Sequence, residues 1–226
     1  MTVPTSPPVP SPTAAPRAGR TGTLLAAGLV AGPVFVVTVT VQALTRDGFD
    51  LGRHPISLLG VGTAGWVQIA NFVLAGLLSM AFAVGVRRVL GTGPGATWAP
   101  RLLAVFGAGL VAGGVFVADP ALGFPPGTPP GMPDEMSWHG VLHAAAPPVA
   151  FLALVAACLV LARWYRRAGH SGLAVYSAAT ALVCLALSAW PSQDGASVRL
   201  FAAVVIGFAW LSVLALRLAR ETRRPG

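Results

Sequence analysis

LLAAGLVAGPVFVVTVTVQAL, residues 24–44, is an uncharged and mainly apolar stretch that decides the fold of this chain. As an α-helix it is long enough to cross about 30 Å of hydrocarbon. Five further stretches, each of about 17 to 23 residues, have the length and hydropathy of membrane-spanning helices. They are residues 66–86, 102–118, 139–161, 172–190 and 200–218.

The composition of the chain agrees with a membrane protein. Hydrophobic residues make up 55% of the sequence and charged residues only 10%, whereas a soluble domain carries about 25% charged residues. The fold class predicted is therefore all-α: a polytopic membrane bundle of six transmembrane helices, with membrane lipids as its surroundings. The net charge of +8 does not indicate a nucleic-acid partner, because the arginines are dispersed at helix ends, where they meet lipid headgroups. The sequence does not identify a protein partner.

The arginines alternate between the segments that connect these stretches, and this alternation predicts the topology. Twelve of the fifteen precede the first stretch, separate the second from the third or the fourth from the fifth, or follow the sixth. Only Arg46, Arg53 and Arg199 fall on the other side. The positive-inside rule therefore places both termini in the cytoplasm, in a multi-pass protein of the cell (inner or plasma) membrane.

Three domain segments are expected along the chain. Residues 1–20 are rich in proline and are predicted to be a disordered cytoplasmic tail. Residues 21–219 form the six-helix domain, and residues 220–226 are a short basic cytoplasmic tail. Heavy use of Ala, Gly, Pro and Arg, with no Lys, indicates a high-GC coding bias and favours a bacterial source.

The arginine-poor side collects most of the side chains that could carry chemistry. Six of the seven acids and three of the four histidines lie there, in or next to residues 45–65, 119–137 and 191–197. The middle segment has six prolines in nineteen residues, which indicates an ordered lid rather than a flexible linker. Any function is therefore expected on this face.

A metal site is one interpretation of these residues. His139 and His143 are spaced i, i+4, so they share one helix face and could bind one zinc-like divalent ion together with Asp119. Ser57, Asp50 and His54 are the candidate catalytic residues. Ser57 or Asp50 would orient water or substrate, and His54 is an alternative to Asp119 as a metal ligand. The other predicted members of the polar pocket are Arg46, Asp47, Arg53, Asn71, Asp194 and Arg199.

Two functional hypotheses remain open at this point. The first is a metal-assisted hydrolase that acts on a lipid, or on an ester or amide on the outer side of the membrane. The second is a non-enzymatic module that binds lipid or a partner protein, in which the polar cluster is an ordered network of loops. A transporter is least favoured, because no Asp, Glu or Lys lies in the middle of a predicted span.

Two separated motifs carry a resemblance to a known family. They are DGFDLGRHPISLLGVGTAGWVQIANFVLAG, residues 47–76, and GVFVADPALGFPPGTP with SWHGVLH, residues 114–129 and 137–143. These segments resemble the bacterial membrane family called domain of unknown function 998, and the resemblance extends over about residues 24–218. It implies a six-helix fold in the membrane and implies no activity.

A looser likeness connects the chain with the membrane hydrolases that include alkaline ceramidases. Those proteins use a Ser, an Asp and a His-x-x-x-His pair around zinc, and Ser57, Asp119, His139 and His143 would take these places here. They have seven helices, however, with the histidine pair in the last one. The likeness is thus limited to the types of the candidate site residues and does not extend to the fold.

Overall fold

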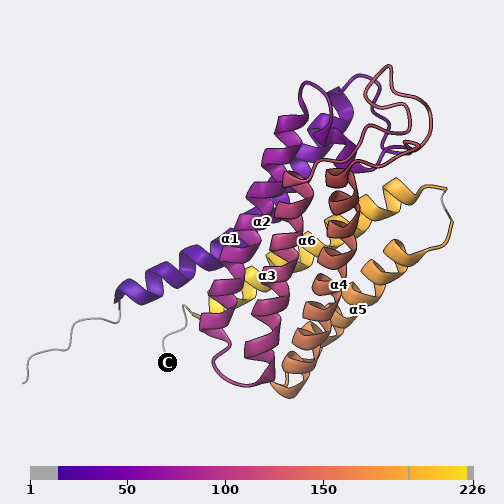
Figure 1. The fold of residues 1–226 in the computed structure, drawn as a ribbon. Coiled ribbons are helices and arrows are strands. Elements are labelled where there is room, and N and C mark those ends of the chain that lie inside the picture. Colours follow the sequence, from indigo (N-terminus) through magenta and orange to yellow (C-terminus); the bar gives the residue numbers. More distant parts are fainter. Residues whose placement is uncertain (1–14, 193, 223–226) are drawn as a thin grey trace, which may run out of the picture.

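The computed structural model describes residues 15–192 and 194–222 of the chain (Figure 1). Within these residues it has six α-helices, one short 3-10 helix and no strand. The elements are α1 (Ala15–Thr45), η1 (Ile56–Gly60), α2 (Gly65–Val89), α3 (Pro94–Val115), α4 (Trp138–Arg167), α5 (Ser171–Ala189) and α6 (Ala196–Glu221). The predicted all-α, six-helix fold is confirmed.

The helices form a closed ring in chain order. Each packs against the next, and α6 returns to pack against α1. Glycines allow the close approaches: a Cβ atom on Gly28 of α1 would lie 2.5 Å from the Phe82 ring of α2. Another on Gly32 would lie 2.7 Å from Phe208 of α6. Phe208 of α6 packs inside the bundle. The centroid of its aromatic ring lies 5.2 Å from that of Phe35 and 5.7 Å from that of Phe106.

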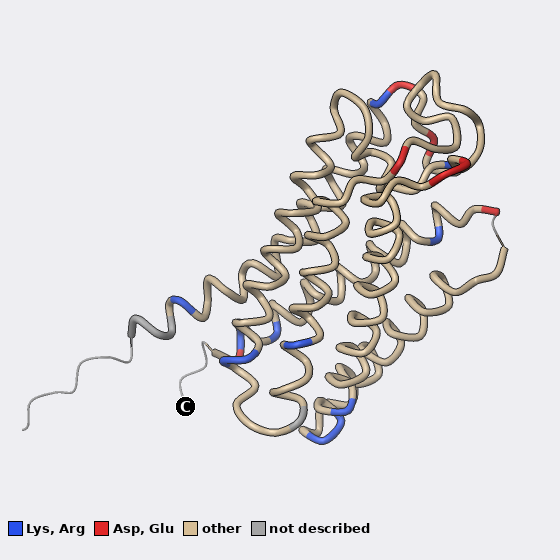
Figure 2. The backbone as a smooth tube through the Cα atoms, viewed as in Figure 1, with Lys and Arg blue, Asp and Glu red and all other residues tan. Residues whose placement is uncertain are grey.

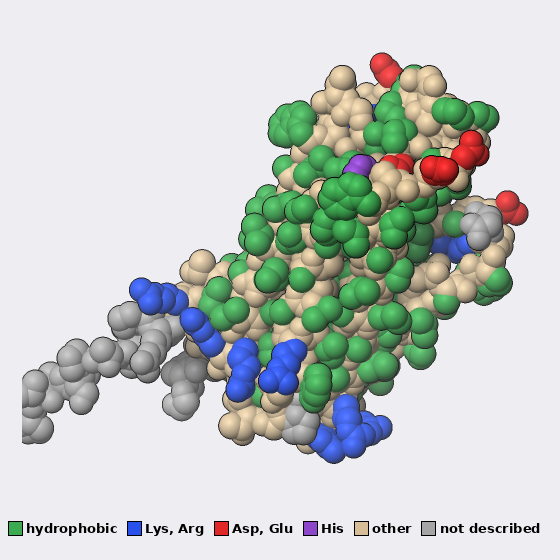
Figure 3. Space-filling model, viewed as in Figure 1, with side chains coloured by type: hydrophobic (Ala, Val, Ile, Leu, Met, Phe, Trp, Pro, Cys, Tyr) green, Lys and Arg blue, Asp and Glu red, His purple; other side chains and the backbone are tan. Residues whose placement is uncertain are grey.

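All six α-helices are long and apolar enough to cross a membrane. Apolar side chains cover most of the face seen in Figure 3 between the two ends of the bundle. On the surface of the helices, residues such as Val37, Leu152 and Leu182 are more than half exposed. Such a surface is stable in hydrocarbon and not in water. The chain is therefore a multi-pass membrane protein.

The two ends of the bundle differ in charge, as Figure 2 shows. One end, called here the arginine end, has the short connections 90–93 and 168–170, the described part of both termini and most of the arginines. The other, called the loop end, is formed by residues 46–64, 116–137, 190–192 and 194–195, with most of the acids. The alternation read from the sequence thus separates the charges in space.

Several helix bounds differ from those predicted. Helix α3 begins at Pro94, where 102 was expected, and ends at Val115, where 118 was expected. Its early start is compatible with Pro94, since proline is tolerated in the first helical turn. Helix α1 already includes residues 15–20, which were predicted to be disordered. The rest of that predicted tail, 1–14, and residues 223–226 lie outside the described residues.

Candidate functional site

Ser137 lies in the candidate site and caps the N-terminus of α4. Its hydroxyl accepts a hydrogen bond from the Gly140 backbone N–H at 3.0 Å and donates one to Asp119 Oδ1 at 2.5 Å. The Ser137 N–H donates to Asp119 Oδ2 at 2.9 Å. A Cβ atom at position 140 would lie 2.0 Å from this carboxylate, so glycine is required there. Both oxygens of Asp119 are thereby used to fix the start of a helix.

The environment keeps Asp119 ionised. The pKa of its carboxyl lies below the usual value, chiefly because the Ser137 hydroxyl donates to it; the Ser137 N–H and the nearby His139 and His143 lower it further, against partial desolvation. The loop end therefore carries a fixed negative charge beside the start of α4.

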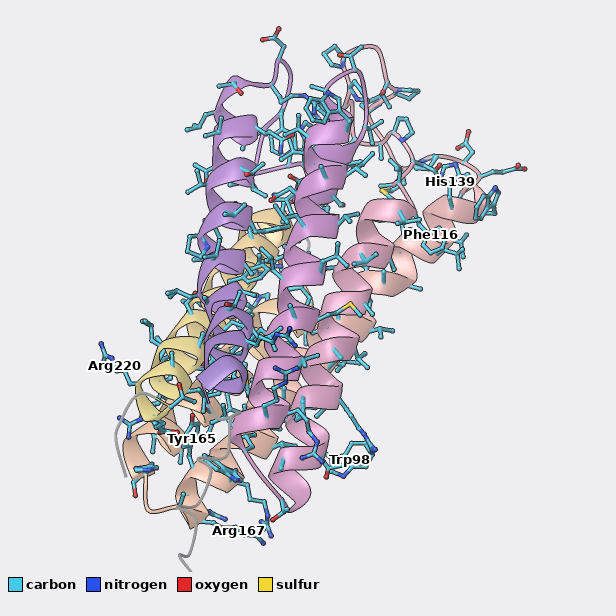
Figure 4. The ribbon with its side chains drawn as sticks, turned by 90° about the vertical axis from the view of Figure 1, so that its left-hand side faces the viewer. Trp98, Phe116, His139, Tyr165, Arg167 and Arg220 are labelled. Carbon is cyan, nitrogen blue, oxygen red and sulfur yellow. The ribbon has the colours of Figure 1, made fainter. Side chains whose placement is uncertain are left out.

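His139 and His143 bind the backbone that follows α3. Nδ1 of His139 lies 2.9 Å from the Val117 carbonyl oxygen. Nδ1 of His143 lies 2.7 Å from the Phe116 carbonyl oxygen and 3.1 Å from that of Gly113. Because a carbonyl oxygen only accepts, Nδ1 carries the proton in both rings. Figure 4 shows His139 and Phe116 together at the loop end, far from Arg167 and Arg220 at the arginine end.

This use of the two histidines bears on the predicted metal site. In the part of the chain that the structure describes, no three His, Cys, Asp or Glu side chains form a group that could hold a metal ion. His139, His143 and Asp119 do not form such a group. Nδ1 of each ring contacts a carbonyl oxygen at the end of α3, and both carboxylate oxygens of Asp119 accept hydrogen bonds from Ser137.

His54, a predicted catalytic residue, joins the first two loops. Its side chain is 3% exposed and lies against the rings of Phe49 and Phe124. Nδ1 accepts from the Asp50 N–H at 2.9 Å, so Nε2 carries the proton and donates to the Leu122 carbonyl oxygen at 3.1 Å. Both ring nitrogens are occupied by backbone groups, and neither is free to act on a substrate.

The other predicted loop residues also contact backbone. Arg46 donates to the carbonyl oxygens of Leu59 at 2.9 Å and Val61 at 2.6 Å, and burial lowers its pKa. Arg199 donates to two carbonyls in residues 192–194. Arg53 reaches Pro130 O at 3.5 Å.

The acids of these loops make turns or face solvent. Asp50 Oδ1 accepts from the Gly52 N–H at 2.8 Å, and Asp47 and Asp194 are exposed. Within the described residues the ion pair is Arg217–Glu221, at the opposite end of the bundle. The arginines and acids of the loop end thus stabilise loops and do not converge on one pocket.

Asn71 lies deeper, in a buried cluster of amides between α1 and α2. Gln68 Oε1 accepts from Gln42 Nε2 at 2.8 Å and from Asn71 Nδ2 at 3.3 Å. Asn71 also donates to the Phe35 carbonyl oxygen at 3.1 Å. The cluster is separate from the loop-end residues with which Asn71 was grouped by sequence.

A cavity of about 480 Å³ occupies the loop-end half of the ring. Its walls are mainly apolar and come from α3, α4, α5 and α6, with Phe35 and Phe72 from α1 and α2. Leu152, Leu185 and Leu200 line it and are also 61%, 43% and 37% exposed on the bundle surface, so the cavity is open toward hydrocarbon. Oxygen- or nitrogen-bearing side chains that line it are Ser57, His143, Ser188 and Ser197.

A smaller cleft of about 140 Å³ lies next to the cavity at the loop end. Ser57 and His143 line both spaces, and Asp119 lines the cleft. Three of the residues selected from the sequence are thus brought together. The sequence analysis did not predict the cavity itself. One signal for it is Gly113, which lines the cavity and has no atom within 4 Å of where a Cβ would be.

Comparison with known proteins places the chain in a family. No curated protein and no solved structure matches it. The family described as "Protein of unknown function (DUF998)" matches residues 29–217, which include most of the first and sixth spans, the four spans between them and the connecting loops. The chain belongs to this family.

Proposed function

We propose that this protein binds an amphiphilic lipid in the cavity between α3, α4, α5 and α6. The observation that carries the proposal is the cavity itself: about 480 Å³, apolar along its length, and polar only where Ser57, His143, Ser188 and Ser197 line it. Ligand pockets have volumes of roughly 300–1,000 Å³ with a few polar groups among apolar walls. An acyl chain fits such walls, with its polar end toward the loop end.

The proposal includes an orientation. The arginine end faces the cytoplasm by the positive-inside rule, so the loop end lies on the outer side of the cell membrane and the cavity is at the depth of the outer leaflet. The lipid would then enter sideways from that leaflet, past the exposed leucines of α4, α5 and α6.

A cavity-filling substitution tests the proposal. Leucine at position 113 would place its side chain in the open space beside Gly113 while leaving the carbonyl that His143 binds. The purified protein is irradiated with a diazirine analogue of monopalmitoylglycerol, and cross-linked peptides are identified by mass spectrometry. We expect adducts on cavity-lining segments of α4 and α5, lost in Gly113→Leu.

Gly172→Leu is the matched control, because Gly172 also has open space at its Cβ position but lies on α5 at the arginine end. It should cross-link like the wild type. Adducts spread evenly over the outside of the bundle, and unchanged in Gly113→Leu, would overturn lipid binding in the cavity.

A lipid hydrolase is the second candidate, favoured by one observation: Ser57, Asp119 and His143 line the same cleft beside the cavity. The same preparation separates the two functions. Release of palmitate from monopalmitoylglycerol, abolished in Ser57→Ala, supports hydrolysis, whereas intact lipid recovered from the protein supports binding alone.

A further inference from the structure

His143 has one ring nitrogen without a partner, and this nitrogen is central to the chemistry of the cavity. The side chain is only 7% exposed, and its Nδ1–H is held by two carbonyl oxygens of residues 113–116. Nε2 of the neutral ring is then an acceptor, and no group in residues 15–192 and 194–222 donates to it. Because the ring is largely buried and lines both the cavity and the cleft, a ligand in these spaces that donates to Nε2 is favoured.

The charges around the cavity exclude one large class of ligand. Of the described residues, no Arg, Asp or Glu lines the cavity, and the chain has no Lys. The arginines at this end already donate to backbone carbonyls, Arg46 to Leu59 and Val61 and Arg199 to residues 192–194. A phosphate or carboxylate would therefore be buried without a counter-charge, which is unfavourable.

The adjoining cleft adds a repulsive charge. Asp119 lines it and is kept ionised by Ser137, so an anionic headgroup that extends from the cavity past His143 meets a carboxylate. A hydroxyl group suffers no such penalty. It can donate to Nε2 and accept from the hydroxyl of Ser57, which lines both spaces.

We infer that the cavity selects uncharged, hydroxyl-bearing amphiphiles, and that Nε2 of His143 is the acceptor that recognises the hydroxyl. This inference rests on the proposed lipid binding and narrows its ligand class to long-chain alcohols and acylglycerols. Phospholipids and fatty-acid anions, which share the same chains, are excluded by their headgroups.

Three probes with the same chain test the selection: hexadecanol, palmitate and hexadecyl phosphate, each in competition with the diazirine monopalmitoylglycerol. Hexadecanol should compete, and the two anions should compete at least about tenfold less well. Equal competition by hexadecyl phosphate would overturn the inference.

The substitution His143→Asn tests the residue. The asparagine amide nitrogen takes the place of Nδ1, so the bonds to the α3 carbonyls persist, but nothing replaces Nε2. Hexadecanol affinity should fall by about tenfold, which is the upper value expected for one net hydrogen bond.

His139→Asn is the matched control, since His139 binds Val117 through the same nitrogen but lines neither space. It should leave hexadecanol affinity unchanged. Wild-type affinity in His143→Asn would overturn the role of Nε2 while leaving lipid binding intact. If no probe labels the wild-type cavity and Gly113→Leu changes nothing, the proposed function fails instead.

Discussion

The loop end and the arginine end both contain backbone that lies outside the helices and needs hydrogen-bond partners, and they satisfy it in different ways. At the arginine end the helices are connected by the short segments 90–93 and 168–170, so few backbone groups there lack a hydrogen-bond partner within a helix. Its arginines are mostly directed outward: Arg87 reaches Gly91 O at 2.7 Å on an exposed surface, and Arg101 lies over Trp98. They are placed to meet headgroups and bind little of the protein.

The loop end contains three longer irregular segments, and its polar side chains are used to satisfy their backbone. Arg46 and His54 bind carbonyls of the first and second loops, while His143 binds those at the end of α3. Non-helical backbone near hydrocarbon is stable only where protein groups or water satisfy it. The number of charges at each end of the bundle thus predicts the orientation of the protein in the membrane, whereas the contacts of individual polar groups determine how the loops at that end fold.

The largest expected effect comes from removing the Arg46 guanidinium. Arg46→Met keeps the unbranched stem but leaves the carbonyls of Leu59 and Val61 without their charged donor and loses the contact with the Phe124 ring. We expect a loss of about 2–4 kcal/mol in the free energy of unfolding, measured in mixed micelles. The counterpart Arg87→Met at the arginine end should cost less than about 0.5 kcal/mol. Equal losses of unfolding free energy in Arg46→Met and Arg87→Met would contradict the difference described between the loop end and the arginine end.

The sequence predicts the bundle well because the helices depend on local composition. Each span is a run of apolar residues whose backbone must be hydrogen-bonded internally, and the arginine alternation follows from the same topology. The glycines at 28 and 32 allow close packing of α1 with its neighbours, since Gly28 meets Phe82 and Gly32 meets Phe208.

The candidate site is harder to predict because it depends on where helices end. With α3 ending at Val115, the carbonyl groups of Phe116 and Val117 have no helical partner, and they accept hydrogen bonds from Nδ1 of His143 and His139, which the i, i+4 spacing alone does not predict. The cavity depends on the space left when six helices close into a ring, and Gly113 contributes to it because it leaves open space at its Cβ position. Ser57 and His143 do come together, as their shared side of the membrane suggests.

An intermediate effect is expected at the start of α4. Ser137→Ala removes the cap of the helix and the hydroxyl that donates to Asp119, and should cost about 1 kcal/mol at neutral pH. The counterpart is Thr97, whose hydroxyl reaches only Gly93 O at 3.3 Å near the arginine end. Thr97→Ala should change the unfolding free energy by less than about 0.5 kcal/mol.

The same substitution has a pH signature. Because the folded-state pKa of Asp119 is depressed, its contribution to stability is complete above the ordinary value of 3.8 and is lost as pH falls through the lower folded-state value. Unfolding free energies measured from pH 6 to about pH 3 should therefore fall less steeply in Ser137→Ala than in the wild type. Parallel curves would show that Ser137 does not set the ionisation of Asp119.

The smallest effect is expected in the amide cluster of α1 and α2, where Gln42 lies three residues before the end of α1 and Gln68 three residues after the start of α2. Gln68→Leu removes one acceptor, but Gln42 and Asn71 each keep a backbone carbonyl, those of Thr38 at 3.3 Å and Phe35 at 3.1 Å. Hydrogen bonds between membrane helices average about 0.6 kcal/mol and reach about 1.7 kcal/mol. A loss within this range is expected.

A double-mutant cycle with Gln42→Leu measures the coupling of the pair directly, and about 0.6 kcal/mol is expected. The atoms Gln42 Oε1, Gln68 Nε2 and Asn71 Oδ1 are buried and have no partner among the described residues, so the wild type already bears a desolvation cost that leucine removes. That cost offsets part of the lost hydrogen bond. A coupling above about 2 kcal/mol would mean that the amide cluster stabilises the fold as strongly as the polar contacts of the loops do. Stability would then depend on whether a contact is polar or apolar, and not on which end of the bundle it belongs to.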